Sequence, residues 1–184
     1  MFWYIVFATI PAGILSLILD KIVGKIIGDN INAEMLVIAI ALIIMGILLY
    51  IVDKKSEATV SFEKITFKHS MLIGISQCLA AAFPGVSRSG ITMTVGRYLG
   101  LDRESSAKYS FMLAMPITLA AVIFDLKHFT FGLPFFIGVL ASFLVGIAII
   151  KFLLNYLKNG SFKAFAIYRV VIGIIVIIIF FTRI

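Results

Sequence analysis

The stretch SMLIGISQCLAAAFPGVSRSGITMTVGRYL, residues 70–99, decides how this chain folds, because polar residues interrupt a long apolar segment at its middle. Residues 70–83 are apolar but fall short of the roughly 20 residues that a helix needs to cross a bilayer. Pro84 and Gly85 end this helix and lead into Val-Ser-Arg-Ser-Gly at 86–90. We therefore predict a re-entrant hairpin with its tip at 84–90 and a returning helix at 91–99. Irregular backbone at membrane depth must be surrounded by protein or line a watery cavity, so the tip is expected to line one.

The segments on both sides of this hairpin are long enough to span a membrane. Of the 184 residues, 62% are hydrophobic and 14% are charged, a composition that excludes an ordinary water-soluble domain. Apolar segments of spanning length cover residues 2–19, 35–52, 108–126, 133–157 and 164–182. The sequence predicts an all-α integral membrane protein, with about five transmembrane helices and one re-entrant helical hairpin in a single transmembrane domain, residues 1–184.

The net charge of +7 lies mostly in the predicted loops. One side of the membrane would carry nine basic residues, Lys54, Lys55, Lys64, Lys68, Arg97, Arg103, Lys108, Lys158 and Lys163, and the other four, Lys21, Lys25, Lys127 and Arg183. This asymmetry agrees with a hairpin that enters from the cytoplasmic side. We expect these residues to contact anionic lipid head groups, and we favour membrane lipids over nucleic acid as the partner of the positive charge.

A faint internal repeat links two of the predicted spans. Pro11 precedes Asp20 by nine residues, and Pro116 precedes Asp125 by the same distance. We interpret residues 1–52 as the remnant of a first repeat and 69–184 as a second repeat that contains the hairpin at about 70–99. Inverted repeats place membrane sites where the two halves meet. Because the first copy has no hairpin before it, half of a two-part site is expected to be missing from this sequence.

The residues of the tip have the chemistry of a phosphate site. Gly85 and Gly90 allow close approach of backbone N–H groups, and the start of the following helix offers unpaired donors. Arg88 supplies a planar fork for two oxygens, while Ser87 and Ser89 are expected to donate hydrogen bonds or to cap the helix. We therefore predict that the tip binds an anion.

Two alternatives explain the arginine differently. Arg88 could extend to the membrane surface or pair with a carboxylate, since an arginine in a bilayer needs a counterion or a ligand. The string Gly-x-Ser-Arg-Ser also occurs in cysteine-dependent phosphatases, which need a cysteine six residues before the arginine. That position is Ala82, and Cys78 lies too far away, so this class of soluble enzyme is excluded.

The motifs around the tip resemble those of a known family. The strings Gly74-x-x-Gln77-Cys78-Leu79-Ala80 and Pro84-Gly85-x-Ser87-Arg88-Ser89-Gly90 are similar to the second signature of the bacterial undecaprenyl-diphosphate phosphatase family, also called the bacitracin-resistance family. Further similarities are Ile10-Pro11-Ala12-Gly13, Tyr109-Ser110-Phe111 before Pro116, and Phe165-Ala166-x-Tyr168-Arg169. Members are multi-pass enzymes of the plasma membrane that hydrolyse undecaprenyl diphosphate to undecaprenyl phosphate, which recycles the lipid carrier for cell-wall synthesis.

The resemblance also implies roles for the tip residues. It implies that Arg88 and Ser87 are catalytic and that Ser89, Gly85 and Gly90 bind the substrate phosphate. It further implies a divalent cation, Mg²⁺ or Ca²⁺, an isoprenyl diphosphate substrate and no nucleic-acid partner, and it leaves a homo-oligomer open.

The chain departs from the family pattern at its N-terminus. The glutamate-rich motif and the Ser-Ser-x-Gly-His type loop have no counterpart, so the sequence resembles an N-terminally truncated member without the metal ligands. The activity of such a chain stays open, and the alternative is a non-catalytic binder or transporter of the isoprenyl phosphate carrier. The remaining polar residues are interpreted as interfacial anchors (His69, His128), loop charges (Glu57, Glu63), helix ends (Asp20, Asp125) and side chains that extend to the membrane surface (Lys151, Arg169).

Overall fold

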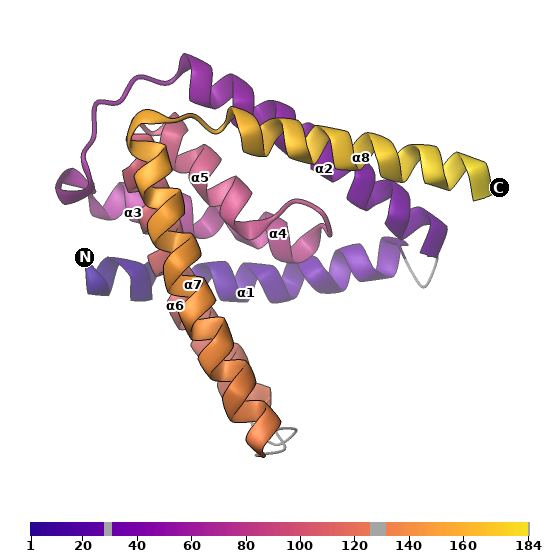
Figure 1. Ribbon diagram of the computed structural model, residues 1–184, viewed down its shortest axis with the longest axis horizontal. Helices are drawn as coiled ribbons and strands as arrows, with labels where there is room; N and C mark the ends of the chain where they lie inside the picture. Colours follow the sequence, from indigo (N-terminus) through magenta and orange to yellow (C-terminus); the bar gives the residue numbers. More distant parts are fainter. Residues whose placement is uncertain (28–30, 126–131, 184) are drawn as a thin grey trace.

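The computed structural model describes residues 1–27, 31–125 and 132–183, which form helices and their connecting loops (Figure 1). The helices are α1 (Phe2–Ile27), α2 (Ile31–Lys55), the 3-10 turn η1 (Phe62–Lys64), α3 (Phe67–Ser76), α4 (Cys78–Ala82), α5 (Arg88–Tyr98), α6 (Arg103–Asp125), α7 (Leu133–Asn159) and α8 (Lys163–Arg183).

Five of these helices are long and apolar enough to cross a membrane, namely α1, α2, α6, α7 and α8. This confirms the predicted all-α integral membrane protein with about five spans. One detail was wrong, because α1 continues to Ile27 and Asp20 therefore lies inside the helix instead of marking its end. The division into two repeats stays a prediction, although Pro11 and Pro116 both lie inside long helices.

Helices α3, α4 and α5 form the hairpin. Its two ends lie side by side, because the N–H groups of Thr59 and Val60 donate to the carbonyl of Gly100 and the N–H of Asp102 donates to the carbonyl of Val60. The chain thus enters and leaves the hairpin at one end of the molecule, as the sequence predicted. The eleven residues of α5 extend about 16 Å, roughly half of a ~30 Å bilayer core, so the hairpin returns before crossing.

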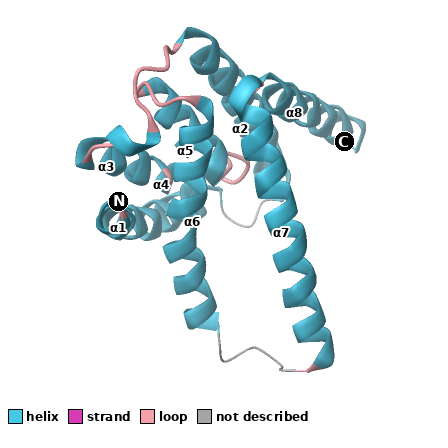
Figure 2. Cartoon of the chain, turned by 60° about the vertical axis from the view of Figure 1, so that its left-hand side comes forward, coloured by secondary structure: helices cyan, strands magenta, loops and turns pink. Residues whose placement is uncertain are grey.

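Other helices enclose the hairpin on several sides. Figures 1 and 2 show α1 along one side of it, α2 with α8 along the other, and α6 crossing it. Ile73 of α3 belongs to a buried cluster with residues of α1 and α6, and Met45 of α2 packs with Val86 and Ile91 at the tip. The irregular backbone of the tip therefore packs against α2 at Val86, where protein surrounds it as membrane depth requires.

Short polar side chains join the hairpin to α6. The Oγ1 of Thr92 and the Oγ of Ser110 lie 2.7 Å apart, and the hydroxyls of Ser70 and Tyr109 form a second buried pair. Ser70 also lies 3.0 Å from the carbonyl oxygen of Tyr4 in α1. These hydrogen bonds satisfy buried hydroxyls that would otherwise destabilise the interface.

The buried carboxylate of Asp53, near the end of α2, connects four parts of the chain. Its Oδ1 accepts from Nε of Arg97 at 3.1 Å and from Nε of Arg103 at 2.7 Å, and its Oδ2 accepts from the N–H of Phe162 at 3.2 Å. Arg97 is 3% exposed and also donates to the carbonyls of Leu101 and Ser56. Asp53 thus holds the base of the hairpin, the start of α6 and the turn between α7 and α8 at one level.

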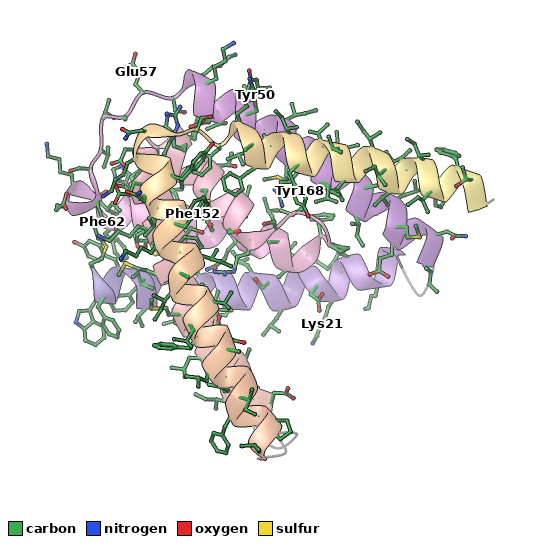
Figure 3. All side chains as sticks on the ribbon, viewed as in Figure 1. Lys21, Tyr50, Glu57, Phe62, Phe152 and Tyr168 are labelled. Carbon is green, nitrogen blue, oxygen red and sulfur yellow. The ribbon has the colours of Figure 1, made fainter. Side chains whose placement is uncertain are left out.

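This cluster corrects the interpretation of two basic residues. Arg97 and Arg103 lie at the predicted end of the molecule, but both bind Asp53, and Arg97 is too deeply buried to contact lipid head groups as predicted. The exposed loop after α2 behaves as predicted, since Glu57 points away from the molecule (Figure 3). His69 closes the capping box of α3 with Thr66, and His128 lies outside the described residues.

Thiol labelling of single cysteines tests whether the hairpin enters and leaves the membrane on the same side. Single cysteines replacing Lys64 and Glu104, in a Cys78→Ser background, should both react with a membrane-impermeant thiol reagent from the same face of sealed vesicles. The two positions flank the hairpin, whose ends are hydrogen-bonded to each other. Reaction from opposite faces would show that residues 70–99 cross the membrane.

Asp53→Asn should destabilise the protein strongly. The substitution leaves two arginines without their carboxylate, and removing one partner of a buried ion pair typically costs about 3–5 kcal/mol. The thermal unfolding midpoint in detergent should fall well below that of Glu57→Gln, a matched loss of one negative charge in the exposed loop. Equal midpoints for the two variants would contradict the role of Asp53.

Candidate functional site

The tight turn of the hairpin covers residues 83–87 and is pressed against α2. It is shorter than the predicted tip at 84–90, because α5 begins at Arg88 and not at residue 91 as predicted. Gly85 has φ of +90°, a left-handed conformation that favours glycine. A Cβ at this position would lie 2.6 Å from the carbonyl oxygen of Ile38, so any larger residue would push the tip away from α2. Gly85 therefore has a structural reason to be glycine, independent of phosphate binding.

Ser87 begins α5 in an unusual conformation. Its φ is +63°, which is uncommon for a residue with a side chain and marks a strained position. Its Oγ accepts a hydrogen bond from the N–H of Gly90 at 3.2 Å and lies 3.3 Å from the Oγ of Ser89. The predicted capping role of Ser87 is confirmed, and the two predicted hydroxyls lie together at the first turn of α5.

Arg88 is the first residue of α5 and is half-buried. Its Nη1 is buried without a hydrogen-bond partner, and both ion pairs found among the described residues belong to Asp53. Within the described part of the chain, therefore, Arg88 does not pair with a carboxylate. A buried guanidinium nitrogen without a partner is costly, and an anionic ligand would satisfy it.

Arg169 of α8 also reaches the tip, and the sequence interpretation missed it. Its side chain donates from Nη2 to the carbonyl of Val86 at 3.1 Å, while Nη1 is buried without a partner. The residue is only 9% exposed, so the prediction that it extends to the membrane surface was wrong. Helix α8 lies close to α2 here, because a Cβ at Gly46 would be 2.9 Å from the carbonyl oxygen of Ala166. Small residues allow this close approach of membrane helices.

Gly90 provides the space for Arg169. A Cβ at Gly90 would lie 2.5 Å from Nη1 of Arg169, so only glycine leaves the guanidinium in its present position. The sequence assigned Gly90 to phosphate binding, and the structure places it between the serines and this second arginine.

A cavity of about 210 Å³ opens beside the tip. Its polar wall consists of Ser87, Ser89, Gly90 and Arg169, and Tyr168 of α8, labelled in Figure 3, also lines it. Apolar side chains form the other walls: Leu49, Met93, Phe111, Leu153, Phe162 and Phe165. Of the predicted site residues, the structure thus brings Ser87, Ser89 and Gly90 to one cavity, whereas Arg88 and Gly85 do not line it.

One signal in the sequence points to Arg169. It lies six residues after the first residue of α8, about 9 Å along an apolar helix, where an arginine needs a counterion or a ligand. The same argument identified Arg88. Applied to every arginine inside a predicted span, it would have identified Arg169 as well.

The described residues do not fit the divalent cation that the resemblance implies. Mg²⁺ and Ca²⁺ prefer several oxygen ligands, chiefly carboxylates. No group of three or more His, Cys, Asp or Glu residues that could hold a metal occurs in the described part of the chain, and Asp53 is engaged by two arginines. The tip instead offers hydrogen-bond donors and positive charge, which suit an anion.

Comparisons with known proteins agree with these observations. A family model described as bacitracin resistance protein BacA matches residues 1–175. A relative from Pelotomaculum thermopropionicum, named undecaprenyl-diphosphatase, is 44% identical over 182 residues, which cover 97% of this chain and 67% of the relative. Proteins of the same name from Gemmatimonas aurantiaca and Moorella thermoacetica are 43% and 36% identical, over 94% and 100% of this chain and 64% and 69% of their own lengths. The chain spans about two thirds of the length of these relatives.

Gly90→Ala tests the position of Arg169. The added methyl should displace the guanidinium and, because the atom that it meets is the end of a flexible side chain, lower the free energy of unfolding by about 1 kcal/mol, the low end of the range for overpacking. Gly138→Ala in α7 is the control, because nothing lies within 4 Å of its Cβ position and alanine favours a helix by about 1 kcal/mol. Thermal unfolding in detergent compares the two, and a Gly90→Ala midpoint at or above that of Gly138→Ala would contradict the observed packing.

Proposed function

The chain belongs to the bacitracin resistance protein BacA family, and from this membership we propose that its hairpin tip binds undecaprenyl diphosphate for hydrolysis to undecaprenyl phosphate and inorganic phosphate. This reaction would return the lipid carrier to cell-wall synthesis and confer resistance to bacitracin. The protein is a multi-pass bacterial membrane protein, so a lipid substrate can reach the site from the bilayer.

One observation carries the proposal: Arg88 has a buried, unpartnered Nη1 at the start of α5. The positive end of the helix and the guanidinium act on the same region, and both favour a bound anion. Arginine can contact two oxygens of one phosphate, which gives orientation as well as attraction.

The residues of the tip suit phosphoryl transfer by electrostatic stabilisation. During hydrolysis, water adds to the terminal phosphorus and the anhydride P–O bond breaks, so that undecaprenyl phosphate leaves. Negative charge develops on the phosphoryl oxygens, where Arg88 would stabilise it. The hydrogen-bonded pair of Ser87 and Ser89, at the first turn of α5, would donate a hydrogen bond to the bound diphosphate.

A covalent role for Ser87 is secondary in this proposal. Its Oγ contacts the N–H of Gly90 and the hydroxyl of Ser89, neither of which is a base. His69 is engaged with Thr66 at the first turn of α3, whereas Ser87 lies at the tip. We therefore assign attack to water, and no step of the proposal uses a divalent cation, whose involvement stays an expectation from the family.

Arg88→Lys and Arg88→Gln test the proposal by binding of farnesyl diphosphate, a short isoprenyl diphosphate, to the purified chain in detergent. We expect Arg88→Gln to weaken binding by about tenfold or more, because a hydrogen bond to a charged group contributes about 1.5–3 kcal/mol. Arg88→Lys should recover only part of the affinity, since lysine keeps the charge and loses the planar fork. Lys151→Gln, which removes an exposed positive charge from α7, is the matched control and should bind normally.

Phosphate release from undecaprenyl diphosphate is measured on the same samples. Release that disappears in Arg88→Gln supports hydrolysis, whereas Arg88-dependent binding without release favours the alternative, a non-catalytic binder or transporter of the carrier. Unchanged binding and release in Arg88→Gln would overturn the proposed site.

A further inference from the structure

The cavity beside the tip differs from a simple phosphate site because only one of its walls is polar. We propose that it binds the phosphate attached to the isoprenyl chain together with the first part of that chain, and that Arg169 is the residue that holds this phosphate. The inference rests on the proposed function and assigns a separate subsite to the lipid end of the diphosphate.

Arg169 is prepared to bind a ligand. Its guanidinium is fixed by the bond from Nη2 to the carbonyl of Val86, and its buried Nη1 has no partner. The same side chain lines the cavity, which at about 210 Å³ is several times the ~30 Å³ that one water molecule occupies in the liquid. A phosphate oxygen bound in this cavity would lie against the guanidinium-bearing side chain of Arg169, which forms part of its wall.

The serine hydroxyls complete the polar wall. Ser87 Oγ accepts from the N–H of Gly90 and shares a 3.3 Å hydrogen bond with Ser89 Oγ, so one of the two hydroxyl hydrogens stays available to donate to a ligand. Both hydroxyls line the cavity on the same side as Arg169. A serine hydroxyl donor and a guanidinium match the oxygens of a phosphate ester.

The apolar walls identify the rest of the ligand. Met93, Phe111 and Phe165 come from three different helices and face the same cavity as Arg169. A free phosphate ion gains nothing from such walls, whereas a hydrocarbon chain is stabilised by leaving water. The combination fits a phosphate that carries an isoprenyl group, and the branched, unsaturated chain can pack on the aromatic rings.

The two arginines near the tip are placed to bind one phosphate group each. Arg169 lines the cavity and Arg88 does not, yet each has a buried Nη1 without a partner near the first turn of α5. A diphosphate has two phosphate groups, of which one is esterified to the lipid. We assign the esterified group to Arg169 and the terminal group to Arg88.

The test measures binding of farnesyl phosphate, which has the esterified phosphate alone, to the purified chain in detergent. We expect Arg169→Gln to weaken binding by about tenfold or more and Lys151→Gln, the matched loss of charge outside the cavity, to leave it unchanged. Arg169→Lys serves as the conservative variant and should retain intermediate affinity. Arg88→Gln should affect farnesyl diphosphate more than farnesyl phosphate.

The apolar walls are tested separately, which keeps the proposal falsifiable if Arg169→Gln does not fold. Phe165 is 39% exposed, so Phe165→Ala should leave the fold intact. It should weaken binding of farnesyl phosphate about threefold or more and leave binding of inorganic diphosphate unchanged. Equal losses for both probes, or no loss for farnesyl phosphate, would exclude a lipid-chain subsite here.

The outcomes separate this inference from the proposed function. Farnesyl diphosphate binding that depends on Arg88, combined with farnesyl phosphate binding that is indifferent to Arg169→Gln, would overturn the subsite and leave the proposed function in place. Absence of binding of both lipids to the unmodified chain would overturn the proposed function itself.

Discussion

The carboxylate of Asp53 sets the geometry on which the candidate site depends. It contacts the side chain of Arg97 in α5 and the N–H of Phe162 before α8, so these two points lie at one level. Gly90 lies seven residues before Arg97, and Arg169 lies seven residues after Phe162, a rise of about 10 Å in both helices. The two residues therefore meet at the same depth, where Arg169 occupies the space left by the glycine.

Interactions elsewhere in the hairpin stabilise the conformation of its tip, which is unfavourable by itself. The tip contains a serine with φ of +63° and the guanidinium of Arg88, and Arg169 of α8 packs against it; each arginine has a buried, unpartnered nitrogen. Such features persist only where the surrounding structure determines them. Here the ion pairs of Asp53, the pair Thr92–Ser110 and the packing of Met45 on the tip hold the backbone in place. Donors fixed in this way need no rearrangement when charge develops on a ligand.

Local sequence information predicted the helices and the hairpin but only half of the polar site. Helix lengths follow from apolar runs, and the hairpin follows from a short run broken at Pro84-Gly85, so both are properties of neighbouring residues. The contacts of Arg97 with Asp53 and of Arg169 with Val86 join residues 44 and 83 positions apart. A prediction based only on how far a charged residue lies from the end of its helix places Arg97 in a loop and Arg169 at the membrane surface. The structure buries both, because each arginine binds a partner that is distant in the sequence: Asp53 in α2 for Arg97 and the carbonyl of Val86, in the turn of the hairpin, for Arg169.

Ligand binding and folding are coupled at such a tip. An anion that binds the native tip and not the unfolded chain stabilises the native state by RT ln(1 + [L]/Kd). The two unpartnered guanidinium nitrogens raise the free energy of the native state, and a bound phosphate would relieve this cost only while the hairpin, α2 and α8 hold their relative positions. Part of the free energy of ligand binding would therefore stabilise the packing of the helices that position the arginines. Since α5 and α8 lie against α2 and meet at Arg169 and Gly90, a bound phosphate would connect the hairpin to the helix that follows α7, and the site would be most rigid when its ligand is present.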